Sequence, residues 1–558
     1  MFTWLKEQLG QYYAGYNPEI QIPTDPKLGD YATNLAFTIA KQEHKNPLEV
    51  AKEIAGKFAD APEFEKVEAS APGFVNFFLK QEFLQNKLGE IHNQKEEYGK
   101  SDLGKDKKVI IEYSAPNIAK PMHVGHLRST IIGDTLANMY SMVGYEVIRW
   151  NYIGDWGTQF GKLIVAYKKW NDPAAFEKQP IEEMVRLYVK FHEELKNNPE
   201  LEEQAREEFR KLEQGDQENR KLWEQFRELS TKEFEKMYQL LGVRFDETKG
   251  ESDYEKVLPD VTAMLEKQGL LKESEGAKII EIADLPPALV QKADGASLYI
   301  TRDIASLQDR IKNYHPHKIL YVVANQQALH FQQLFAVATM LWWTDVELAH
   351  VKYGLVLGED GKKFSTREGN AVPLQEVIEK ITSLAQDVVK QKNPQLSEEE
   401  TKEIAQAIGI GALKYNDLKQ HPYSDIVFDW EAMLDLSGNS GPYIQYTYAR
   451  LSHILDKAGK PTSNEIADLD SIEERLLMKH LLDFPHAIEH SVELYTANAL
   501  ALYLYELANY ANRFYENHRV LEDENKNRQQ ARLVLVATVA TVLKQGLGLL
   551  GITAPERI

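Results

Sequence analysis

The pattern of hydrophobic and polar positions changes along the chain. In residues 1–90, apolar side chains recur at helical spacing, and Gly73–Leu79 is a short apolar run that predicts a buried strand. Val109–Tyr113 is a second such run, followed by a helical pattern over about Leu127–Val143 and a third run, Glu146–Trp150. The order strand, helix, strand predicts a parallel sheet with a crossover helix.

Two longer regions show a helical pattern. Within residues 171–260, apolar positions such as Trp223 and Phe226 recur at helical spacing, which predicts a helical subdomain inserted into the α/β region. From about Leu374 to the end, the chain again shows helical spacing almost throughout. We therefore expect a small α/β unit, an α/β region with a helical insertion, and an all-α region.

Composition narrows the class of protein. The chain has 558 residues, enough for several domains, and 43% of them are hydrophobic, which is typical of a folded globular protein. It contains no cysteine, which excludes disulfides, thiolate zinc sites, iron–sulfur clusters and a cysteine nucleophile. The formal net charge is −20, but residues 171–260 hold 24 acidic and 15 basic residues. The charge therefore says little about surfaces outside the predicted insertion.

Two features that the sequence lacks bear on the cellular compartment. No apolar run reaches the length that a membrane-spanning helix needs, and the first residues lack the pattern of a signal peptide. We therefore expect a cytoplasmic enzyme that does not bind a membrane.

The first motif with chemical meaning is His123-Val124-Gly125-His126, which lies between a predicted strand and a predicted helix. A helix N-terminus has unpaired N–H groups and a partial positive charge, so it attracts phosphates. Two imidazoles there can donate to triphosphate oxygens, and Gly125 can let a base or ribose approach the backbone. The alternative is a pair of histidines at a helix start with no chemical role.

A second motif is the loop Gly358–Asn370, which follows an apolar run and contains three glycines and three cationic side chains. Such a loop can close over a leaving pyrophosphate and stabilise its charge. Taken alone, it is equally typical of a solvated turn.

Together and in this order, the two motifs resemble the signatures of class I aminoacyl-tRNA synthetases, His-x-Gly-His and Lys-Met-Ser-Lys-Ser, the second as Lys363–Arg367. Two departures are Thr366, where the general loop has lysine, and Ala115, where many relatives have serine. Longer segments resemble the arginyl-tRNA synthetases in particular: Ser114–Gly133, Asn151–Gly161, Tyr299–Asp303, Gln326-Gln327 and Leu550–Arg557.

The resemblance implies a multidomain fold, α/β plus all-α. Its expected parts are an additional tRNA-contacting α/β domain (1–90), a Rossmann-like parallel-sheet catalytic domain (108–372) with the helical insertion at about 171–260, a helical stem (373–440) and a helical-bundle anticodon-binding domain (441–558). The insertion is expected to have no editing site, because a pocket for a charged side chain rejects wrong amino acids by itself.

The implied reaction is that of an arginine–tRNA ligase. ATP and L-arginine form arginyl-adenylate and pyrophosphate, and the arginyl group passes to the 3′-terminal adenosine of arginine tRNA, releasing AMP. The resemblance also implies that tRNA binds before arginine is activated efficiently. The implied catalytic residues are His123, His126 and Lys363. The implied ATP-binding residues are His123, Gly125, His126, Lys362, Lys363, Ser365 and Arg367. Mg²⁺ is expected with ATP, without a metal site of the protein's own.

Arginine as substrate makes a separate demand, because its guanidinium has five donors and a fixed charge that carboxylates must meet. Glu112 lies in the predicted strand before the first motif, and Asp303 lies one helical turn after Tyr299. Without the resemblance, Asp303 reads as a surface charge or as a partner of Arg302. With it, the implied arginine-binding residues are Glu112, Ser114, Asn117, His123, Tyr299, Asp303 and Gln327.

The tRNA surfaces are less clear in the sequence. Aromatic and arginine side chains can stack on unpaired bases, but tyrosines at helical spacing are also typical of a core. The candidates for tRNA contacts are Asn76, Phe78, Tyr448, Arg513 and Arg519. A monomer is expected on family grounds.

Two other functions are compatible with part of the sequence. One is an enzyme of the wider His-x-Gly-His group that adenylates a small acid without tRNA, but such enzymes need no tyrosine-rich helical C-terminal region. The other is a non-catalytic scaffold derived from a synthetase, against which the intact His123, His126, Lys363 and Asp303 argue.

Overall fold

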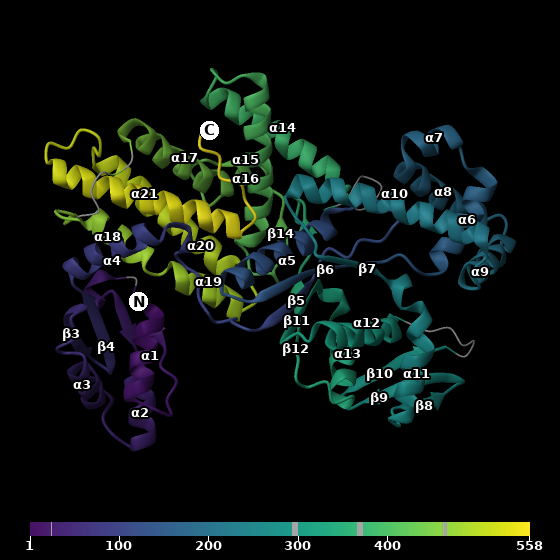
Figure 1. Ribbon diagram of the computed structural model, residues 1–558, viewed down its shortest axis with the longest axis horizontal. Helices are drawn as coiled ribbons and strands as arrows, with labels where there is room; N and C mark the ends of the chain where they lie inside the picture. The colour runs from purple at the N-terminus through teal and green to yellow at the C-terminus, as the bar shows by residue number, and fades with distance from the viewer. Residues whose placement is uncertain (24, 293–298, 365–371, 460, 462–465) are drawn as a thin grey trace.

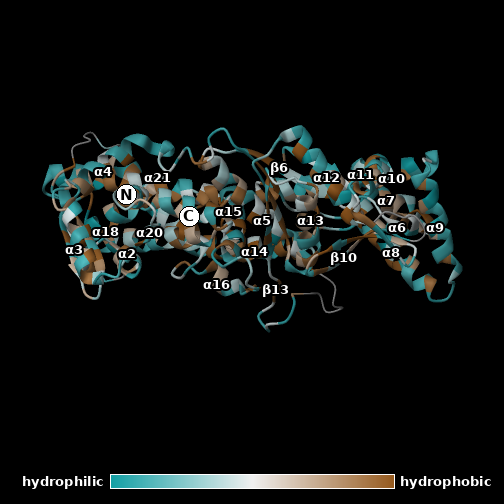
Figure 2. Ribbon diagram, turned by 90° about the horizontal axis from the view of Figure 1, so that it is seen from below, coloured by the Kyte–Doolittle hydropathy of each residue, from teal (hydrophilic) through white to brown (hydrophobic). Residues whose placement is uncertain are grey.

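The structure is a computed structural model that describes all residues except 24, 293–298, 365–371, 460 and 462–465. The molecule is elongated. A small N-terminal domain lies at one end and a group of helices from the middle of the chain lies at the other (Figures 1 and 2).

The N-terminal domain has an antiparallel sheet covered by helices. The strand order is β1-β2-β4-β3, and β4 (Phe74–Leu79) is the strand that the sequence predicts at Gly73–Leu79. The other elements are α1 (Phe2–Tyr12), β1 (Ile20–Gln21), β2 (Tyr31–Thr33), α2 (Leu35–Glu43), α3 (Pro47–Lys57) and β3 (Phe64–Ser70); α4 (Gln81–Gln94) follows.

A five-stranded parallel sheet forms the centre of the molecule, with the order β12-β11-β5-β6-β7. Its strands are β5 (Lys108–Glu112), β6 (Glu146–Ile153), β7 (Glu247–Gly250), β11 (Lys318–Ala324) and β12 (Glu347–Tyr353). Residues Val109–Ile111 are fully buried, as expected for a parallel strand covered on both faces. The chain fills one side of β5 first and the other side later, so the strand order reverses beside β5. The predicted Rossmann-like fold is confirmed.

The crossover helix between β5 and β6 is α5 (Val124–Met142), close to its predicted bounds. After β6 come α6 (Thr158–Trp170), α7 (Pro173–Lys178), α8 (Pro180–Leu195), α9 (Glu200–Glu213) and α10 (Gln217–Leu241). The predicted insertion, 171–260, extends too far, because β7 lies inside that range and belongs to the central sheet. Strand β7 is a short edge strand in which only Gly250 is buried, so it has no apolar run to reveal it.

A small antiparallel sheet with the order β10-β9-β8 was not predicted. Its strands are β8 (Leu271–Ser274), β9 (Ala277–Ile282) and β10 (Leu285–Gln291), and they share a core with α11 (Leu258–Lys267), α12 (Tyr299–Tyr314) and α13 (Ala328–Met340). Helix α12 leads from this sheet to β11 and lies beside the central sheet (Figure 1), where its Arg310 side chain bonds Glu112 at the carboxyl end of β5.

The C-terminal third is helical, as predicted. It contains α14 (Leu374–Lys392), α15 (Glu398–Leu418), α16 (Trp430–Leu434), α17 (Gly441–Ala458), α18 (Ile472–Leu481), α19 (Phe484–Glu493), α20 (Asn498–Asn517) and α21 (Lys526–Leu549). By length and composition α21 could cross a membrane, contrary to the sequence expectation, but 72% of its most apolar window is buried inside this fold. It is therefore typical of a core helix.

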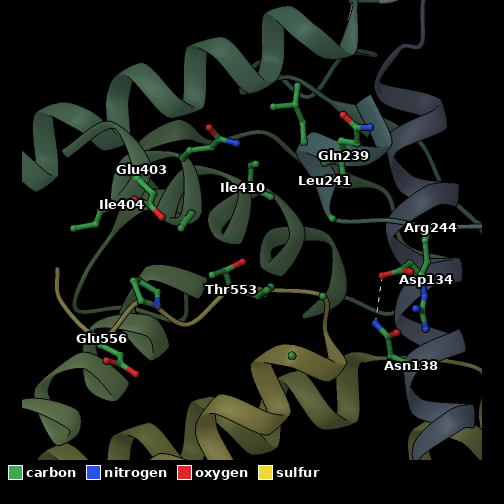
Figure 3. A pocket seen from close by; sticks show the side chains of 18 of the residues that line it. Asp134, Asn138, Gln239, Leu241, Arg244, Glu403, Ile404, Ile410, Thr553 and Glu556 are labelled. Carbon is green, nitrogen blue, oxygen red and sulfur yellow. Dashed lines mark hydrogen bonds between the residues drawn. The ribbon is translucent and has the colours of Figure 1, made fainter. Parts of the chain in front are cut away.

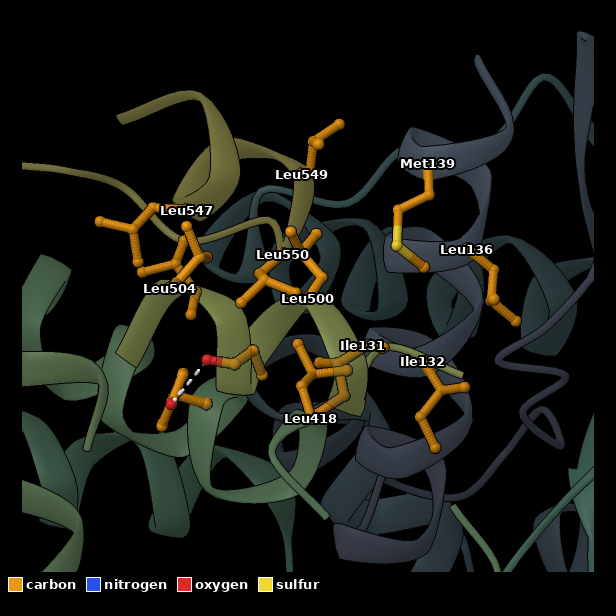
Figure 4. Close-up of a cluster of buried hydrophobic side chains, with 14 of the residues drawn as sticks. Ile131, Ile132, Leu136, Met139, Leu418, Leu500, Leu504, Leu547, Leu549 and Leu550 are labelled. Carbon is orange, nitrogen blue, oxygen red and sulfur yellow. Dashed lines mark hydrogen bonds between the residues drawn. The ribbon is translucent and has the colours of Figure 1, made fainter. Parts of the chain in front are cut away.

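Helix α5 joins the central sheet to these C-terminal helices. A cavity of about 990 Å³ lies between α5, the end of α10, α15 and the C-terminal residues, and Asp134, Gln239, Glu403 and Thr553 are among its lining side chains (Figure 3). Beside it, Ile131 and Leu136 of α5 belong to the buried cluster that includes leucines of α15, α20 and α21 (Figure 4). Because α5 is buried on nearly all sides, its position is fixed relative to both regions.

Candidate active site

The two histidines of the first motif lie at the N-terminus of α5. His123 is the N-cap residue, and its Nδ1 accepts a hydrogen bond from the Gly125 N–H at 3.1 Å. The Nδ1 atom of His126 accepts from the His123 N–H at 3.1 Å, and the two rings stack with centroids 3.9 Å apart. A neutral imidazole that accepts at Nδ1 carries its hydrogen at Nε2. Each ring is therefore left with Nε2–H as a donor.

Both imidazoles are neutral near pH 7. Burial lowers the pKa of His126 to about 3. Burial also lowers the pKa of His123, and the positive charges of Lys363 and Lys120 add to this effect. The pair therefore acts through directed N–H donors, with the positive charge supplied by the lysines around it.

The structure gives Gly125 a role beside the predicted approach of a base or ribose, which stays a prediction. A Cβ atom at this position would lie 2.9 Å from Cε1 and 3.0 Å from Nδ1 of His123. The missing side chain therefore makes room for the His123 ring, which folds back over the helix terminus.

The second motif begins beside the histidines. β13 (Val356–Leu357) leads into a tight turn, after which Lys363 pairs with Leu357 and the Phe364 N–H donates to the Val356 carbonyl at 2.9 Å. Where the described chain resumes, the Val372 carbonyl accepts from the Val124 N–H at 3.3 Å. The described ends of the loop are thus attached near the start of α5.

Lys362 lies in this turn, where its N–H donates to Asp360 at 3.1 Å. Ser365 and Arg367, which the sequence assigns to ATP binding, lie outside the described residues.

The first predicted arginine-binding carboxylate, Glu112, ends β5 and is buried against a cation of the protein itself. The Arg310 guanidinium of α12 donates from Nη2 to Oε2 of Glu112. Burial raises the pKa of Glu112 against the opposing effect of Arg310, and the negative charge of Asp303 adds to the rise. Glu112 and Asp303 therefore lie in one electrostatic environment.

Asp303 lies in the first turns of α12 and is not paired with Arg302, which bonds Glu255 instead. Its Oδ2 atom lies 2.5 Å from Nε2 of His330 on α13. Tyr299, one turn earlier, is 61% exposed, and Gln327 is exposed at the carboxyl end of β11. These residues belong to the edge at which ligands bind in doubly wound sheets.

Asn117 and Ser114 differ in accessibility. Asn117 is exposed and its backbone pairs with Gly154 at the end of β6. Ser114 is 3% exposed, and its Oγ lies 2.9 Å from the hydroxyls of Tyr238 and Thr130. Its φ of 71° bends the chain sharply out of β5. The Ser114 side chain therefore takes part in packing the loop against α10, and its contact with arginine stays a prediction.

The sequence interpretation missed Glu251, which follows β7 at the same edge. Burial raises its pKa to about 8, with Arg302 opposing and Asp303 adding to the rise. Among the described residues, no group of three or more His, Cys, Asp or Glu side chains is placed to hold a metal ion. No sequence signal reveals Glu251, because the short strand before it has no apolar run.

Comparison with known proteins shows the same three-part organisation. Residues 87–430 match the family described as tRNA synthetases class I (R), catalytic domain; residues 444–558 match the DALR anticodon binding domain; and residues 4–79 match the arginyl tRNA synthetase N terminal domain. The chain belongs to the arginyl-tRNA synthetase family.

Individual relatives agree with this placement. The chain is 43% identical to an arginine–tRNA ligase of Halothermothrix orenii, covering 97% of this chain and 95% of the relative. It is 42% identical to one of Clostridium perfringens, covering 99% and 98%. The solved structure of the Thermus thermophilus arginyl-tRNA synthetase matches with a TM-score of 0.85 and 27% identity, over 100% of both chains.

Some tRNA contacts predicted for this synthetase are placed unfavourably. Asn76 is 4% exposed within its sheet, and Tyr448 is 5% exposed in the helical core, so neither side chain is available at the surface. Phe78 is half-buried, with the Lys66 ammonium 5.3 Å from its ring centroid. The expectation that tyrosines at helical spacing form a core applies to Tyr448.

Two other predicted contacts, Arg513 and Arg519, are exposed. The structure adds a pair that the prediction did not include: Tyr515 is 43% exposed, and the Arg450 guanidinium lies 4.8 Å from its ring centroid. A ring and a guanidinium stacked at a surface form the kind of platform on which an unpaired base can stack.

Proposed function

We propose that this chain is an arginine–tRNA ligase. It activates L-arginine with ATP to arginyl-adenylate, and it then transfers the arginyl group to the 3′-terminal adenosine of arginine tRNA. The observation that carries the proposal is the meeting of two sites at one sheet edge. A neutral donor pair, His123 and His126, lies at a helix N-terminus, and the carboxylates Glu112 and Asp303 lie at the ends of neighbouring elements.

ATP binds through its phosphates. The Nε2–H groups of His123 and His126 donate to phosphate oxygens, and the helix N-terminus contributes its partial charge. Lys363, whose charge already acts on His123, stabilises the leaving pyrophosphate together with Lys362. Ser365 and Arg367 complete this group as predictions from the sequence motif. Gly125 supports ATP binding indirectly, by leaving room for the His123 ring.

Arginine binds with its guanidinium toward Asp303 and Glu112, beside Tyr299 and Gln327. Asn117 and the His123 region receive the α-amino and carboxylate end. The arginine carboxylate then attacks the α-phosphorus of ATP, and pyrophosphate leaves. The chain's contribution is positioning and charge stabilisation, since none of these residues acts as a covalent nucleophile.

Mg²⁺ enters with ATP, whose phosphate charge it neutralises. We assign residues 108–372 to catalysis, with an insertion that has no editing site. We assign 1–90 and 441–558 to tRNA contacts and 373–440 to the stem between them. A cytoplasmic monomer is the expected form.

The test is ATP–pyrophosphate exchange with each amino acid, with and without arginine tRNA. We expect exchange with arginine and with no other amino acid, and only when arginine tRNA is present. Asp303→Ala should raise the KM for arginine far more than the KM for ATP. Asp387→Ala, on the exposed face of α14, is the matched control and should change neither. Exchange with another amino acid, or equal losses for arginine and ATP in Asp303→Ala, would refute the assignment.

A further inference from the structure

Each of the two carboxylates assigned to the substrate guanidinium already has a cation of the protein beside it. Glu112 has Arg310, and Asp303 has His330. The two pairs differ in burial and in the chemistry of the cation, and this difference determines what happens when a third cation, the substrate side chain, arrives.

The Glu112–Arg310 pair is permanent. Arg310 is fully buried, and its guanidinium carbon lies 4.6 Å from the ring centroid of Trp150 and 5.4 Å from that of Tyr321. A guanidinium does not lose its proton in a protein. Arg310 therefore keeps its charge and its hold on one oxygen of Glu112 whether or not the substrate is present.

The Asp303–His330 pair is accessible. The two side chains are 24% and 23% exposed, and Nε2 of His330 lies 2.5 Å from Oδ2 of Asp303. Burial lowers the pKa of His330, but the hydrogen bond and the charge of Asp303 outweigh it, so the pKa lies above its usual value. In the free protein His330 is thus the protonated partner of Asp303 over part of the neutral range.

A substrate guanidinium pairs best with a carboxylate through two parallel N–H···O bonds, which need both oxygens. In the free protein Oδ2 of Asp303 is occupied by His330. A guanidinium and an imidazolium at the same carboxylate would repel each other, because like charges at contact distance in a partly buried site are unfavourable.

From this geometry we propose that His330 is a titratable counter-ion of Asp303, which gives up its proton when the guanidinium of arginine takes its place. The proposal rests on the proposed function, since it assumes that Asp303 receives the substrate side chain. The N–H bond of the imidazolium breaks, the proton passes to solvent, and neutral His330 remains beside the new ion pair. Arginine binding is then coupled to the release of up to one proton.

The other groups near His330 contribute differently. Glu112 on β5 raises the pKa of His330 and is itself held by Arg310. His350 on β12 has its pKa lowered to about 4 by burial, so it is neutral and has no proton to release at pH 7. Glu251 after β7 is a second protonated group near Asp303, because its pKa is about 8. A guanidinium would favour ionisation of Glu251 too, so its proton must be distinguished from that of His330.

The experiment is calorimetric titration of the full chain, in complex with arginine tRNA, with L-arginine at pH 6.5. Two buffers of different ionisation enthalpy give the number of protons released per arginine. Wild type should release a measurable fraction of one proton, and His330→Gln should release less. Glu251→Gln should still release the share of protons that is missing in His330→Gln. The matched control, His350→Gln, should leave the number unchanged.

A kinetic measurement supplies the second readout. In ATP–pyrophosphate exchange, the KM for arginine should rise as pH falls below the free-state pKa of His330, by at most about tenfold per pH unit for one linked proton. His330→Gln should reduce this dependence to the part that Glu251 contributes, while the KM for ATP shows no such change in either protein. A merely structural role of His330 would instead affect both substrates without altering the slope.

The outcomes separate the two proposals. If arginine binds and wild type releases no more protons than His330→Gln, the counter-ion proposal is wrong while the proposed function stands. If arginine neither binds nor supports exchange at any pH, the proposed function itself fails.

Discussion

The replacement Arg128→Lys tests how firmly α5 is held in place. Arg128 is fully buried, and all five of its N–H groups have acceptors. Nε and Nη2 donate to the two carboxylate oxygens of Asp417 on α15, each at 2.9 Å. Nη1 donates to the carbonyl oxygens of Leu355 at 3.5 Å and Ser424 at 3.0 Å. Nη2 also donates to the carbonyl oxygen of Pro422 at 3.3 Å.

The magnitude follows from this count. Lysine keeps the positive charge but has three donors, so at least two of the five hydrogen bonds are lost. The Leu355 and Pro422 carbonyls also accept from the N–H groups of Ile426 and Gly354, so losing the bonds to them leaves neither carbonyl without a donor. At about 0.5–1.5 kcal/mol for each lost hydrogen bond, we expect a loss of about 1–3 kcal/mol in the free energy of unfolding. Arg206→Lys is the control, because Arg206 forms an exposed ion pair with Glu203 at 3.4 Å, worth at most about 1 kcal/mol.

The assay is urea unfolding of wild type and both variants, monitored by tryptophan fluorescence. The dependence of the free energy of unfolding on urea concentration is compared among the three proteins, because a changed slope would indicate that unfolding is no longer two-state. The KM for ATP is measured alongside, because Leu355 and Ser424 adjoin β13 and β14 (Ile426–Val427), where the loop of Lys363 begins. We expect the KM for ATP to rise in Arg128→Lys only. Equal midpoints for Arg128→Lys and Arg206→Lys would refute the reasoning.

Three further changes have defined outcomes. Gly125→Ala should displace the His123 ring at a cost of about 0.5–1.5 kcal/mol, which raises the KM for ATP in pyrophosphate exchange by roughly two- to tenfold. Gly56→Ala is the control and should leave the KM for ATP unchanged, because its new Cβ meets no atom within 4 Å. Burial raises the pKa of Glu251 from about 4.5 in the unfolded chain to about 8, so the folded protein loses stability as pH rises from 4.5 through 8. Glu251→Gln should make the melting temperature depend less on pH over this range. An unchanged pH dependence would contradict the assignment. Tyr515→Ala should weaken tRNA binding by about 1–3 kcal/mol in a filter-binding assay if a base stacks on it, and an unchanged affinity would exclude that role.

The sequence predicts well those elements whose pattern comes from full burial. β5 and α5 belong to this class, because parallel strands covered on both faces and a helix enclosed on all sides leave continuous apolar signals. β7 shows the opposite case. It has four residues, of which only Gly250 is buried, so nothing in its pattern separates it from the helical insertion before it.

The site was predictable where local sequence determines geometry. The spacing of His123 and His126 places both rings at one helix start, and no tertiary information is needed to see this. The partners of Glu112 and Asp303 could not be predicted in this way. Arg310 is distant from Glu112 in sequence, and His330 lies on a different helix from Asp303, so these contacts exist only once the sheet is assembled.

Burial argues against one expectation that rests on residue type. Tyr448 is aromatic and therefore a candidate for base stacking, but its side chain is 5% exposed in the structure. Residue type states what a side chain can bind, whereas exposure depends on which face of its element the rest of the chain covers.

Helix α5 couples the position of the proposed ATP site to the position of the C-terminal helices. Its Thr135 and Asn138 donate to the carbonyls of Leu550 and Leu549 at the end of α21, each at 3.4 Å. Carbonyls at a helix C-terminus have no partner within the helix, so side chains of α5 complete that terminus. The same helix carries His123 at its N-cap. A displacement of α21 must therefore break these bonds or move the helix that holds the imidazole pair, so the region assigned to tRNA is connected to the region assigned to ATP.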